Sequence, residues 1–589
     1  MKIKLNRDAL LSEFGVKTLE DRYMVEGETS PQHAFARAAK MFADNEAHAQ
    51  RLYDYASNLW FMFSTPILSN GGTDRGLPIS CFLNYVPDSR EGITDHYTEN
   101  AWLSSVGGGI GGYWGKVRSV GSKTSRGSES TGVIPFLKVV DAEMLAFSQG
   151  VTRRGSYAAY LPIDHPEIEE FLDIRKPTGG DINRKSINLH HGVIISDKFM
   201  ELIEKATLTP GFDDSWPLID PHSKQVKKVV PAKALWVKLI QNRMETGEPY
   251  IMFGDTVNEA LPEFQKVKGL KVNQSNLCSE ITLPTNNERT AVCCLSSVNV
   301  EEFDSWKNDP LFIPDLIRML DNVLSYFIQN APVALEKASY SAMMERSLGL
   351  GAMGFHAYLQ RHNVPFESAI AKSMNERIFK HIKEQADIAT RELAIERGPC
   401  PDDHTKTVRN AHLLAIAPNA SSSIICGNTS PSIEPYRSNA FVQKTKSGSS
   451  LLKNEYLEVV LDDLDMNTEE VWKSIMTNNG SVQHLDFLDD YTKDVFKTAP
   501  EIDQRWLVDF AADRQKYICQ AQSLNLFFAP TVSKQELHNV HLRAWKKKVK
   551  TLYYLRSEAI KRAEKVSDEK LREYIFDFSD ENSCLSCEG

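Results

Sequence analysis

The stretch QSNLCSEITLPT (274–285) places an amide, a thiol and a carboxylate at alternating positions, as Asn276, Cys278 and Glu280. In an extended segment, residues i, i+2 and i+4 point to the same face, so these three groups would converge. A lone cysteine in such a run is most simply a small buried hydrophobe. A buried carboxylate, however, costs free energy unless it has a partner or a role. The triplet therefore predicts a catalytic centre inside the fold.

Two further apolar runs carry cysteines. PISCFLNY (78–85) contains Cys81, and AVCCLSSVNV (291–300) contains Cys293 and Cys294. Their composition indicates buried strands. These thiols are either packing residues or partners in the chemistry of the 274–285 stretch.

The composition is that of an ordinary globular protein. The 589 residues are 42% hydrophobic and 25% charged, with a formal net charge of −10. An acidic balance argues against nucleic acid and anionic membrane surfaces as partners. No apolar run reaches the roughly 18 residues needed to span a bilayer, and the N-terminus lacks the apolar core of a signal peptide. Nine cysteines, few for this length, favour reduced thiols and a cytoplasmic location.

The chain divides into four predicted parts. Residues 1–64 form a helical segment, 65–500 a mixed region, 501–576 a C-terminal α/β segment and 577–589 a mobile tail. The tail lacks apolar residues to bury, which is typical of a disordered end.

Short apolar runs alternate with helical stretches in the mixed region. IPFLKVV (134–140), YAAYLP (157–162) and HHGVIIS (190–196) have the character of strands, whereas PEIEEFLDIRK (166–176) has that of a helix. This alternation predicts an α/β fold with a largely parallel sheet.

Two motifs were weighed and set aside. GGGIGG (107–112) matches G-x-G-x-x-G, but it follows a helical stretch and opens no helix, so we expect a glycine-rich turn that permits close backbone approach. Cys584 and Cys587 in the tail could bind zinc, but there is no second C-x-x-C to complete four ligands. A mobile dithiol is the other interpretation of this pair.

The motifs taken together resemble a known family. NLCSEITLPT (276–285), TPILS (65–69), SCFLN (80–84), RSLGLGAMGF (346–355), PNASSSIICGNTSPSIEP (418–435) and KTLYYLRS (550–557) occur in the order found in the large, catalytic subunit of class I ribonucleotide reductase. The resemblance covers nearly the whole chain. It implies a ten-stranded α/β barrel, preceded by a helical N-terminal segment, with a central finger loop that carries a radical cysteine.

The resemblance implies a role for each member of the first triplet. Cys278 would form the thiyl radical that abstracts the 3′ hydrogen of the ribose. Glu280 would be the base for the 3′ hydroxyl, and Asn276 would bind the substrate hydroxyls. The implied substrate is a ribonucleoside diphosphate.

The other cysteines acquire redox roles in the same way. Cys81 and Cys293 would be the reducing pair that ends each turnover as a disulfide. Cys294 is the neighbouring candidate, but strand alternation would point it away from the site. Cys584 and Cys587 would re-reduce the buried disulfide and then be reduced by thioredoxin or glutaredoxin.

Substrate-binding positions also carry over. Thr65 and Ser80 match residues that contact the substrate, and Ala420, Ser421 and Ser422 match the loop that holds its diphosphate. A serine-rich loop that opens a helix offers backbone N–H groups to an anion; by composition alone it could be an ordinary helix cap.

The resemblance also implies a deoxynucleoside or adenosine triphosphate effector, bound at a homodimer interface. Asp88 matches a contact to its base or sugar region, and Arg118 and Arg126 match its phosphate ligands. Without the resemblance these two arginines would be read as a solvated basic loop. Arg153, favoured over Arg154, would face the substrate in the loop that relays effector identity.

The radical requires a source outside this chain. No histidine follows a glutamate at Glu-x-x-His spacing, so a di-iron site is not predicted and no metal is assigned here. The consecutive Tyr553 and Tyr554 match the family's route from a separate, metal-containing small subunit to Cys278. A cobalamin-dependent enzyme is the alternative within the family, and a dithiol-exchange protein or a catalytically inactive nucleotide-binding regulator are the alternatives outside its chemistry.

Only 64 residues precede Thr65, too few for the helical segment and the family's N-terminal ATP cone. We therefore expect the compact form without the cone, which dATP does not switch off through that domain. A phage-encoded chain would act in the host cytoplasm.

Overall fold

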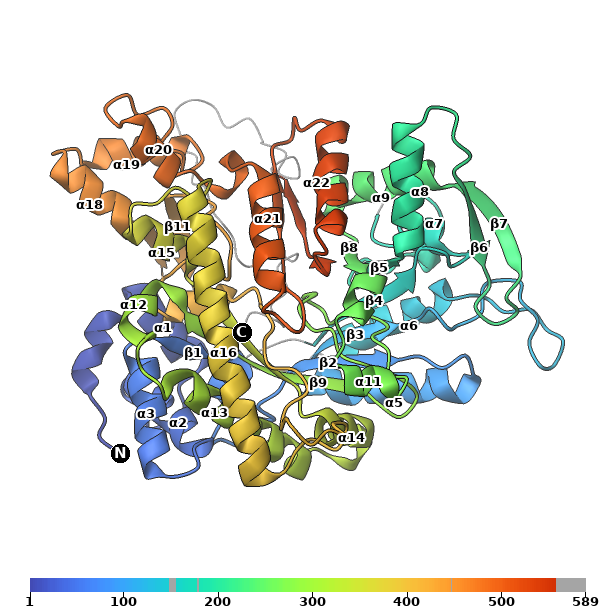
Figure 1. The fold of residues 1–589 in the computed structure, drawn as a ribbon, viewed down its shortest axis with the longest axis horizontal. Helices are drawn as coiled ribbons and strands as arrows, with labels where there is room; N and C mark the ends of the chain where they lie inside the picture. The colour runs from blue at the N-terminus through green and yellow to red at the C-terminus, as the bar shows by residue number, and fades with distance from the viewer. Residues whose placement is uncertain (148–154, 177–178, 446–447, 558–589) are drawn as a thin grey trace.

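The computed structural model describes residues 1–147, 155–176, 179–445 and 448–557. The chain begins with three helices, α1 (Glu13–Arg22), α2 (Pro31–Met41) and α3 (Glu46–Ser57). The side chains of Ser12, Ser30 and Asn45 cap their first turns by accepting backbone N–H hydrogen bonds. These helices lie together at one end of the molecule (Figure 1). The predicted helical N-terminal segment is thereby confirmed.

A nine-stranded sheet organises the described chain. Its order is β1-β9-β2-β3-β4-β5-β8-β14, with β10 paired to β9. The strands are β1 (Phe61–Phe63), β2 (Cys81–Tyr85), β3 (Gly109–Tyr113), β4 (Ser156–Pro162), β5 (His190–Ile195), β8 (Tyr250–Phe253), β9 (Ala291–Asn299), β10 (Leu348–Met353) and β14 (Thr551–Leu552).

The neighbours β2 to β8 pair in parallel, so the prediction of a largely parallel sheet is confirmed. Strand β9 runs antiparallel to β2 and parallel to β10. Beyond β10, parallel bridges at Leu350–Leu414 and Ile416–Gln522 extend the pairing. The curled sheet is the α/β barrel that the sequence predicts.

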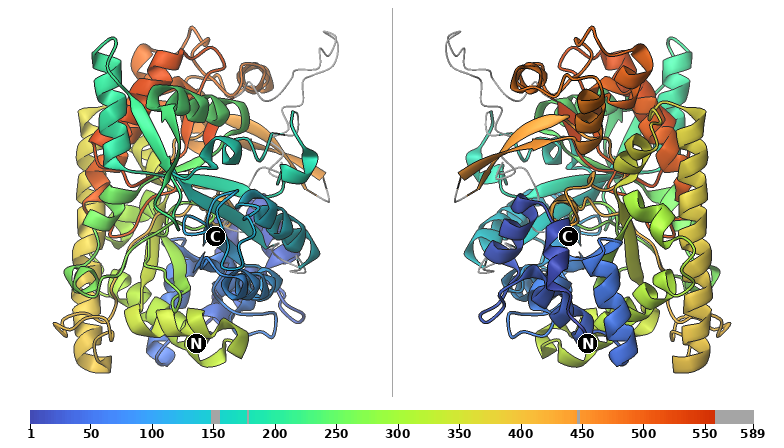
Figure 2. Two further views of the ribbon diagram at one scale, coloured as in Figure 1. Left: turned by 90° about the vertical axis from the view of Figure 1, so that its right-hand side faces the viewer. Right: turned by 90° about the vertical axis from the view of Figure 1, so that its left-hand side faces the viewer.

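Helices surround the sheet (Figure 1). They are α4 (Thr65–Asn70), α5 (Arg90–Ser105), α6 (Ile134–Ala146), α7 (Ile168–Phe171), α8 (Asp197–Leu208), α9 (Ala232–Thr246), α10 (Gly254–Glu259), α11 (Glu263–Val267), α12 (Phe303–Trp306), α13 (Phe312–Asn330), α14 (Glu336–Glu345), α15 (Phe355–Arg361) and α16 (Ala369–Arg397). Helix α13 buries Leu316, Leu320 and Leu324 and packs against α16, β9 and β10. Helix α16 runs along one side of the molecule (Figure 2).

The C-terminal half adds α17 (Ala420–Ile425), α18 (Glu455–Asp463), α19 (Glu469–Thr477), α20 (Asp490–Val495), α21 (Gln504–Gln515) and α22 (Lys534–Lys546). Three strand pairs lie outside the main sheet: β6 (Ser215–Ile219) with β7 (Val226–Pro231), β11 (Ala440–Thr445) with β12 (Gly448–Lys453), and β13 (Leu526–Phe528) with β15 (Leu555–Ser557). Strand β14 joins the last predicted part of the chain to β8 of the sheet. The four predicted domain boundaries remain predictions.

Two local predictions are wrong. IPFLKVV (134–140) is not a strand but the start of α6, whose buried residues Leu137, Val140 and Met144 follow helical spacing. Pro135 lies in the first turn, where its missing N–H costs no helical hydrogen bond.

GGGIGG is not a turn, because Gly109–Tyr113 form β3. The expected close approach is real: a Cβ on Gly111 would lie 1.9 Å from the Ser275 carbonyl oxygen. The glycine thus lets the 274–285 stretch lie against the sheet.

Candidate active site

Cys81 and Cys293 are register partners on the antiparallel strands β2 and β9. Both thiols are buried, and both belong to an apolar cluster that also contains Cys278, Tyr553 and Tyr554. Facing residues of antiparallel strands have Cα atoms roughly 4.5–5.5 Å apart, a separation that a disulfide spans.

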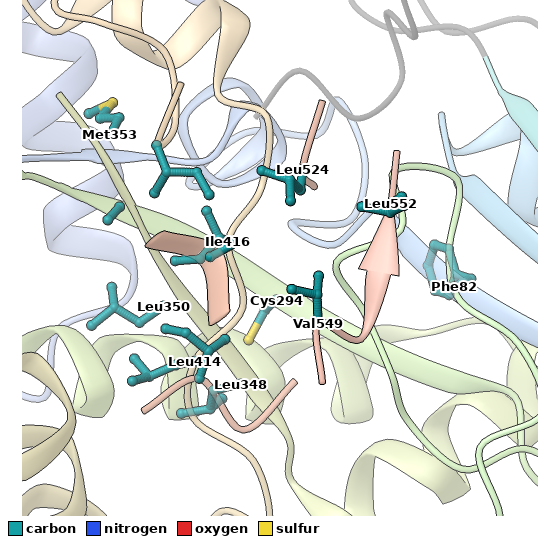
Figure 3. Packing of buried hydrophobic residues seen from close by; sticks show 14 of the residues in the cluster. Phe82, Cys294, Leu348, Leu350, Met353, Leu414, Ile416, Leu524, Val549 and Leu552 are labelled. Atoms are coloured by element: carbon teal, nitrogen blue, oxygen red, sulfur yellow. The ribbon is translucent and has the colours of Figure 1, made fainter. Parts of the chain in front are cut away.

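Cys294 points to the other face of β9. Its Sγ lies 3.4 Å from the carbonyl oxygen of Leu320 in α13. In Figure 3 it lies among apolar side chains that include Leu348 and Val549. Strand alternation therefore separates the two adjacent thiols, as predicted, and only Cys293 faces Cys81.

The 274–285 stretch is a loop rather than an extended strand, which corrects the geometry assumed for the triplet. The Ser279 N–H donates to the Asn276 carbonyl across 3.4 Å, and Ser279 has a φ of 69°. The Asn276 Oδ1 accepts from the Ile281 N–H at 3.2 Å, so this side chain closes the turn. A turn brings the three groups together more tightly than strand alternation would.

Cys278 lies at the tip of this loop and is fully buried. The hydroxyl of Tyr553 lies 3.4 Å from its Sγ. Ser523 Oγ donates to the Cys278 carbonyl oxygen at 2.6 Å and lies 3.2 Å from Glu280 Oε2. The loop is thus held from a segment that lies far along the chain, and the thiol meets a phenol.

The thiol pair and the loop are in contact. Asn276 Nδ2 lies 4.0 Å from Cys81 Sγ. Gln520 Nε2 donates to Cys293 Sγ at 3.4 Å and to the Leu348 carbonyl oxygen at 2.9 Å. Burial raises the pKa of the Cys293 thiol well above its usual value, and the nearby Cys294 adds to the increase. Cys293 is therefore a protonated thiol in this resting arrangement.

Gln520 and Ser523 are contacts that the sequence analysis missed, and Lys550 is a third. Lys550 Nζ is buried and donates to the Cys519 and Gln520 carbonyl oxygens at 2.6 and 2.7 Å. Burial lowers its pKa to about 8. It fixes the segment that presents Gln520 to Cys293. Three lysines precede it in AWKKKVK (544–550), and nothing in that pattern distinguishes the buried one.

Tyr553 and Tyr554 lie between β14 and β15 with their rings in contact. The ring centroids are 4.3 Å apart at an interplanar angle of 53°. Tyr250 of β8 packs against both rings, with centroids at 4.8 and 5.1 Å. A continuous aromatic path therefore leads from Tyr554 through Tyr553 to the Cys278 thiol.

The predicted substrate residues lie beside β1 and β2. Thr65 is the first residue of α4, and its Oγ1 is 2.9 Å from the Tyr23 hydroxyl. Ser80 directly precedes Cys81, and its carbonyl oxygen accepts from the Gly109 N–H.

The predicted diphosphate loop opens α17. Ala420 is its first residue, and Ser421 and Ser422 are buried. Asn419 precedes the helix with a φ of 58° and donates from Nδ2 to Ser297 Oγ of β9 at 2.6 Å. Helix α17 packs against β1 and α1, which brings this loop to the same end of the sheet as Thr65.

Two of the predicted effector residues are ion-paired. Arg118 Nε lies 3.0 Å from Asp88 Oδ2, and its backbone N–H donates to Asp88 Oδ1 at 3.1 Å. His222 Nδ1 is 3.2 Å from the same carboxylate. Arg126 is exposed in the loop between Lys123 and Glu129. Arg153, Cys584 and Cys587 lie outside the described residues.

Two searches of the described ranges find nothing. No group of three or more His, Cys, Asp or Glu side chains is placed to hold a metal ion there. Nor is any helix among them long and apolar enough to cross a membrane.

Known proteins similar to this chain agree with the geometry. A family model for the barrel domain of ribonucleotide reductase matches residues 79–407 and 402–555, and a model for its all-alpha domain matches residues 9–76. The chain is 46% identical over 635 aligned positions to a ribonucleoside-diphosphate reductase large subunit of Invertebrate iridescent virus 3, with 99% of both chains covered.

It is 49% identical over 544 positions to a putative ribonucleoside-diphosphate reductase large subunit of Frog virus 3, covering 92% of each chain. The solved alpha subunit of the class Id ribonucleotide reductase of Actinobacillus ureae superposes with a TM-score of 0.82 at 35% identity, covering 95% of this chain and 99% of the other. The chain belongs to the ribonucleotide reductase large-subunit family.

Proposed function

We propose that this chain reduces ribonucleoside diphosphates to 2′-deoxyribonucleoside diphosphates, the precursors of DNA, by thiyl-radical chemistry. The observation that carries the proposal is the placement of the Cys278 thiol. It lies 3.4 Å from the Tyr553 hydroxyl, in the same buried cluster as the facing pair Cys81 and Cys293. A radical entry point and a two-electron reductant thus lie on either side of one thiol.

The proposed reaction balances as follows. The Cys278 thiyl takes the 3′ hydrogen atom of the ribose and becomes a thiol, which leaves a radical on C3′. Glu280 takes the 3′ hydroxyl proton while the 2′ hydroxyl leaves as water with a proton from the thiol pair. Cys81 and Cys293 supply two electrons and become a disulfide. Cys278 then returns a hydrogen atom to C3′ and is again a thiyl.

Asn276 would serve this reaction in two ways. Its Oδ1 accepts from the Ile281 N–H within the loop. Its Nδ2, directed toward Cys81, would donate to a hydroxyl of the bound substrate. One side chain would therefore position both the loop and the ribose.

The radical would come from a separate, metal-containing small subunit through Tyr554 and Tyr553. As a large subunit of this family, the chain depends on such a partner. The aromatic contact between these two rings supports the route. After turnover, Cys584 and Cys587 would reduce the buried disulfide and be reduced in turn by thioredoxin or glutaredoxin.

Regulation would act on a homodimer that binds a deoxynucleoside triphosphate or ATP. Asp88, Arg118 and Arg126 would hold this effector, and Arg153 would report its identity to the substrate. The pairing of Arg118 with Asp88 keeps a guanidinium fork positioned without a ligand, and such a fork suits a phosphate.

The test is deoxynucleotide formation from CDP, with dATP as effector and dithiothreitol as reductant. Three mixtures are compared: the chain alone, with adenosylcobalamin, and with the small subunit from the same source. Product only with the small subunit, and none with Cys278→Ala, is the expected result. Product with adenosylcobalamin alone would assign the chain to the cobalamin-dependent alternative, and no product in any mixture would overturn the proposal.

A further inference from the structure

A buried charged cluster meets the outer tyrosine of the proposed radical route. The Tyr554 hydroxyl lies 3.3 Å from His190 Nδ1, the first residue of β5. The same nitrogen is 2.6 Å from Glu248 Oε1 and 2.8 Å from an Arg175 Nη atom. Arg175 also donates to Glu248 Oε1 at 2.7 Å. These groups come from four separate segments, so the cluster depends on the complete fold.

The cluster is costly to bury. Glu248, His190 and Arg175 are all largely shielded from water. Burial alone would raise the pKa of the Glu248 carboxyl, but Arg175, His190 and His191 hold it well below its usual value. Glu248 is therefore a carboxylate facing the imidazole. Ion clusters of this kind rarely add stability beyond what apolar packing would supply, so a role beyond stability deserves a test.

Oxidation of Tyr554 requires a proton acceptor. A phenol that loses an electron becomes strongly acidic, and the guanidinium of Arg556 lies 4.0 Å over the Tyr554 ring. A positive charge at that distance disfavours a ring cation, so electron loss must be coupled to proton loss. Among the contacts of the Tyr554 hydroxyl, His190 Nδ1 can accept a proton.

We infer that His190 takes the Tyr554 phenolic proton when Tyr554 is oxidised, and that Glu248 stabilises the resulting imidazolium. This inference rests on the proposed radical route through Tyr554. The electron passes to the oxidant on the small subunit, the O–H bond breaks, and the proton forms an N–H bond at His190 Nδ1. When Tyr554 is reduced by Tyr553, the proton returns from His190 to the Tyr554 oxygen.

The tautomer required is the one with its proton on Nε2. It leaves the Nδ1 lone pair to accept from the Tyr554 hydroxyl and from Arg175. Glu248 Oε1, next to the same nitrogen, then favours the protonated product. Arg175 keeps the carboxylate ionised and oriented, which makes it a positioning residue.

The next residue provides a matched control. His191 Nδ1 is 3.1 Å from the other oxygen of Glu248, and its ring packs against Phe171 rather than a tyrosine. His190 and His191 therefore share the carboxylate and the strand, whereas His190 is the one in contact with Tyr554. A purely structural cluster would need both histidines, whereas proton transfer needs only His190.

The experiment uses the chain with its small subunit and compares His190→Gln, Glu248→Gln, His191→Gln and Tyr554→Phe. We expect His190→Gln to lower turnover by about 100-fold, the lower end of what general acid–base groups contribute. Glu248→Gln should follow it, and His191→Gln should stay within a few-fold of the parent. Substrate binding and thermal unfolding should be alike in His190→Gln and His191→Gln.

Chemical rescue separates proton transfer from packing. Added imidazole should restore part of the turnover of His190→Ala and none of that of Tyr554→Phe. Equal losses in His190→Gln and His191→Gln, or no rescue by imidazole in a folded His190→Ala, would overturn the inference. Full turnover in Tyr554→Phe would instead remove the radical route itself, so failure of the proposed function is distinguishable from failure of this inference.

Discussion

Cys81 and Cys293 face each other directly across the β2–β9 pair, whereas Cys294, one position along, faces α13. The two strands are held in register by pairs on the same ladder, Phe82–Val292 and Leu83–Ala291. A disulfide between the facing thiols needs no change in strand pairing, because their separation already suits the bond. The sheet therefore selects one of two adjacent cysteines for oxidation.

Oxidation should be confined to this pair. After a single turnover without external reductant, peptide mapping should find Cys81 joined to Cys293 and Cys294 still a free thiol. Cys293→Ser should accumulate no deoxynucleotide in repeated turnover. Cys294→Ser is the matched control, because a serine hydroxyl can keep the contact with the Leu320 carbonyl oxygen, and it should remain active. A disulfide that includes Cys294 would contradict the assigned strand faces.

Tyr554→Phe should abolish turnover while nucleotide binding stays intact. Phenylalanine keeps the ring contact with Tyr553 but cannot form a phenoxyl radical. The measurement is deoxynucleotide formation with the small subunit, beside equilibrium binding of the substrate. Tyr157→Phe is the control, since Tyr157 is a buried phenol of β4 that bonds to Trp114 and His96 instead. Normal turnover in Tyr554→Phe would remove the long-range radical route.

Gly111→Ala should impair the loop that carries Cys278. The added Cβ would lie 1.9 Å from the Ser275 carbonyl oxygen and 2.8 Å from the Asn276 Cα, so the loop must move. Overpacking of this kind costs about 1–3 kcal/mol, and turnover should fall more than this loss of stability explains. Denaturant unfolding and steady-state kinetics measure the two effects. Unchanged kinetics in a destabilised variant would show that the loop position is not critical.

Arg118→Gln should weaken binding of the deoxynucleoside triphosphate effector by about tenfold to 100-fold, the range for one charge-assisted hydrogen bond. Lys123→Gln is the control in the same loop, because Lys123 forms an exposed ion pair with Glu129. Calorimetric titration measures both affinities. Equal affinity in the two variants would place the effector phosphates elsewhere.

Acid should destabilise the fold through buried neutral histidines such as His356. Its Nδ1 accepts the Tyr436 N–H at 2.8 Å, and burial lowers its pKa to about 3. The unfolded chain binds this proton below about pH 6.5 and the folded chain does not, so the stability present above pH 6.5 is lost as pH falls toward 3. Each such group contributes at most about 1.4 kcal/mol per pH unit. Urea unfolding of His356→Gln across this range should show a shallower pH dependence than the parent.

The sequence predicts the site better where chemistry and pattern coincide. Cys278, the facing thiols and the tyrosine pair lie in motifs whose order is distinctive, and the alternation along β9 separates Cys293 from Cys294. The strand assigned to IPFLKVV is wrong because a seven-residue apolar run does not reveal the helical spacing that continues to Met144.

Other parts of the site have no local signal. Gln520, Ser523 and Lys550 are common polar residues, and their partners are brought to them only by the fold. His190 and Glu248 lie far apart in the sequence and meet because the starts of β5 and β8 are neighbours in the sheet. Long-range pairing of this kind depends on tertiary packing, which a single sequence does not display.

Strand β14 pairs with β8, some 300 positions earlier (551 against 252), and it immediately precedes the tyrosines that reach Cys278. During synthesis, most of the sheet is therefore made long before this last strand emerges. Until it docks, the thiol has no phenolic neighbour at 553 and no route by which an oxidant could reach it. A nascent chain is consequently protected from self-inflicted oxidative damage, because the hazardous chemistry becomes possible only once assembly is finished.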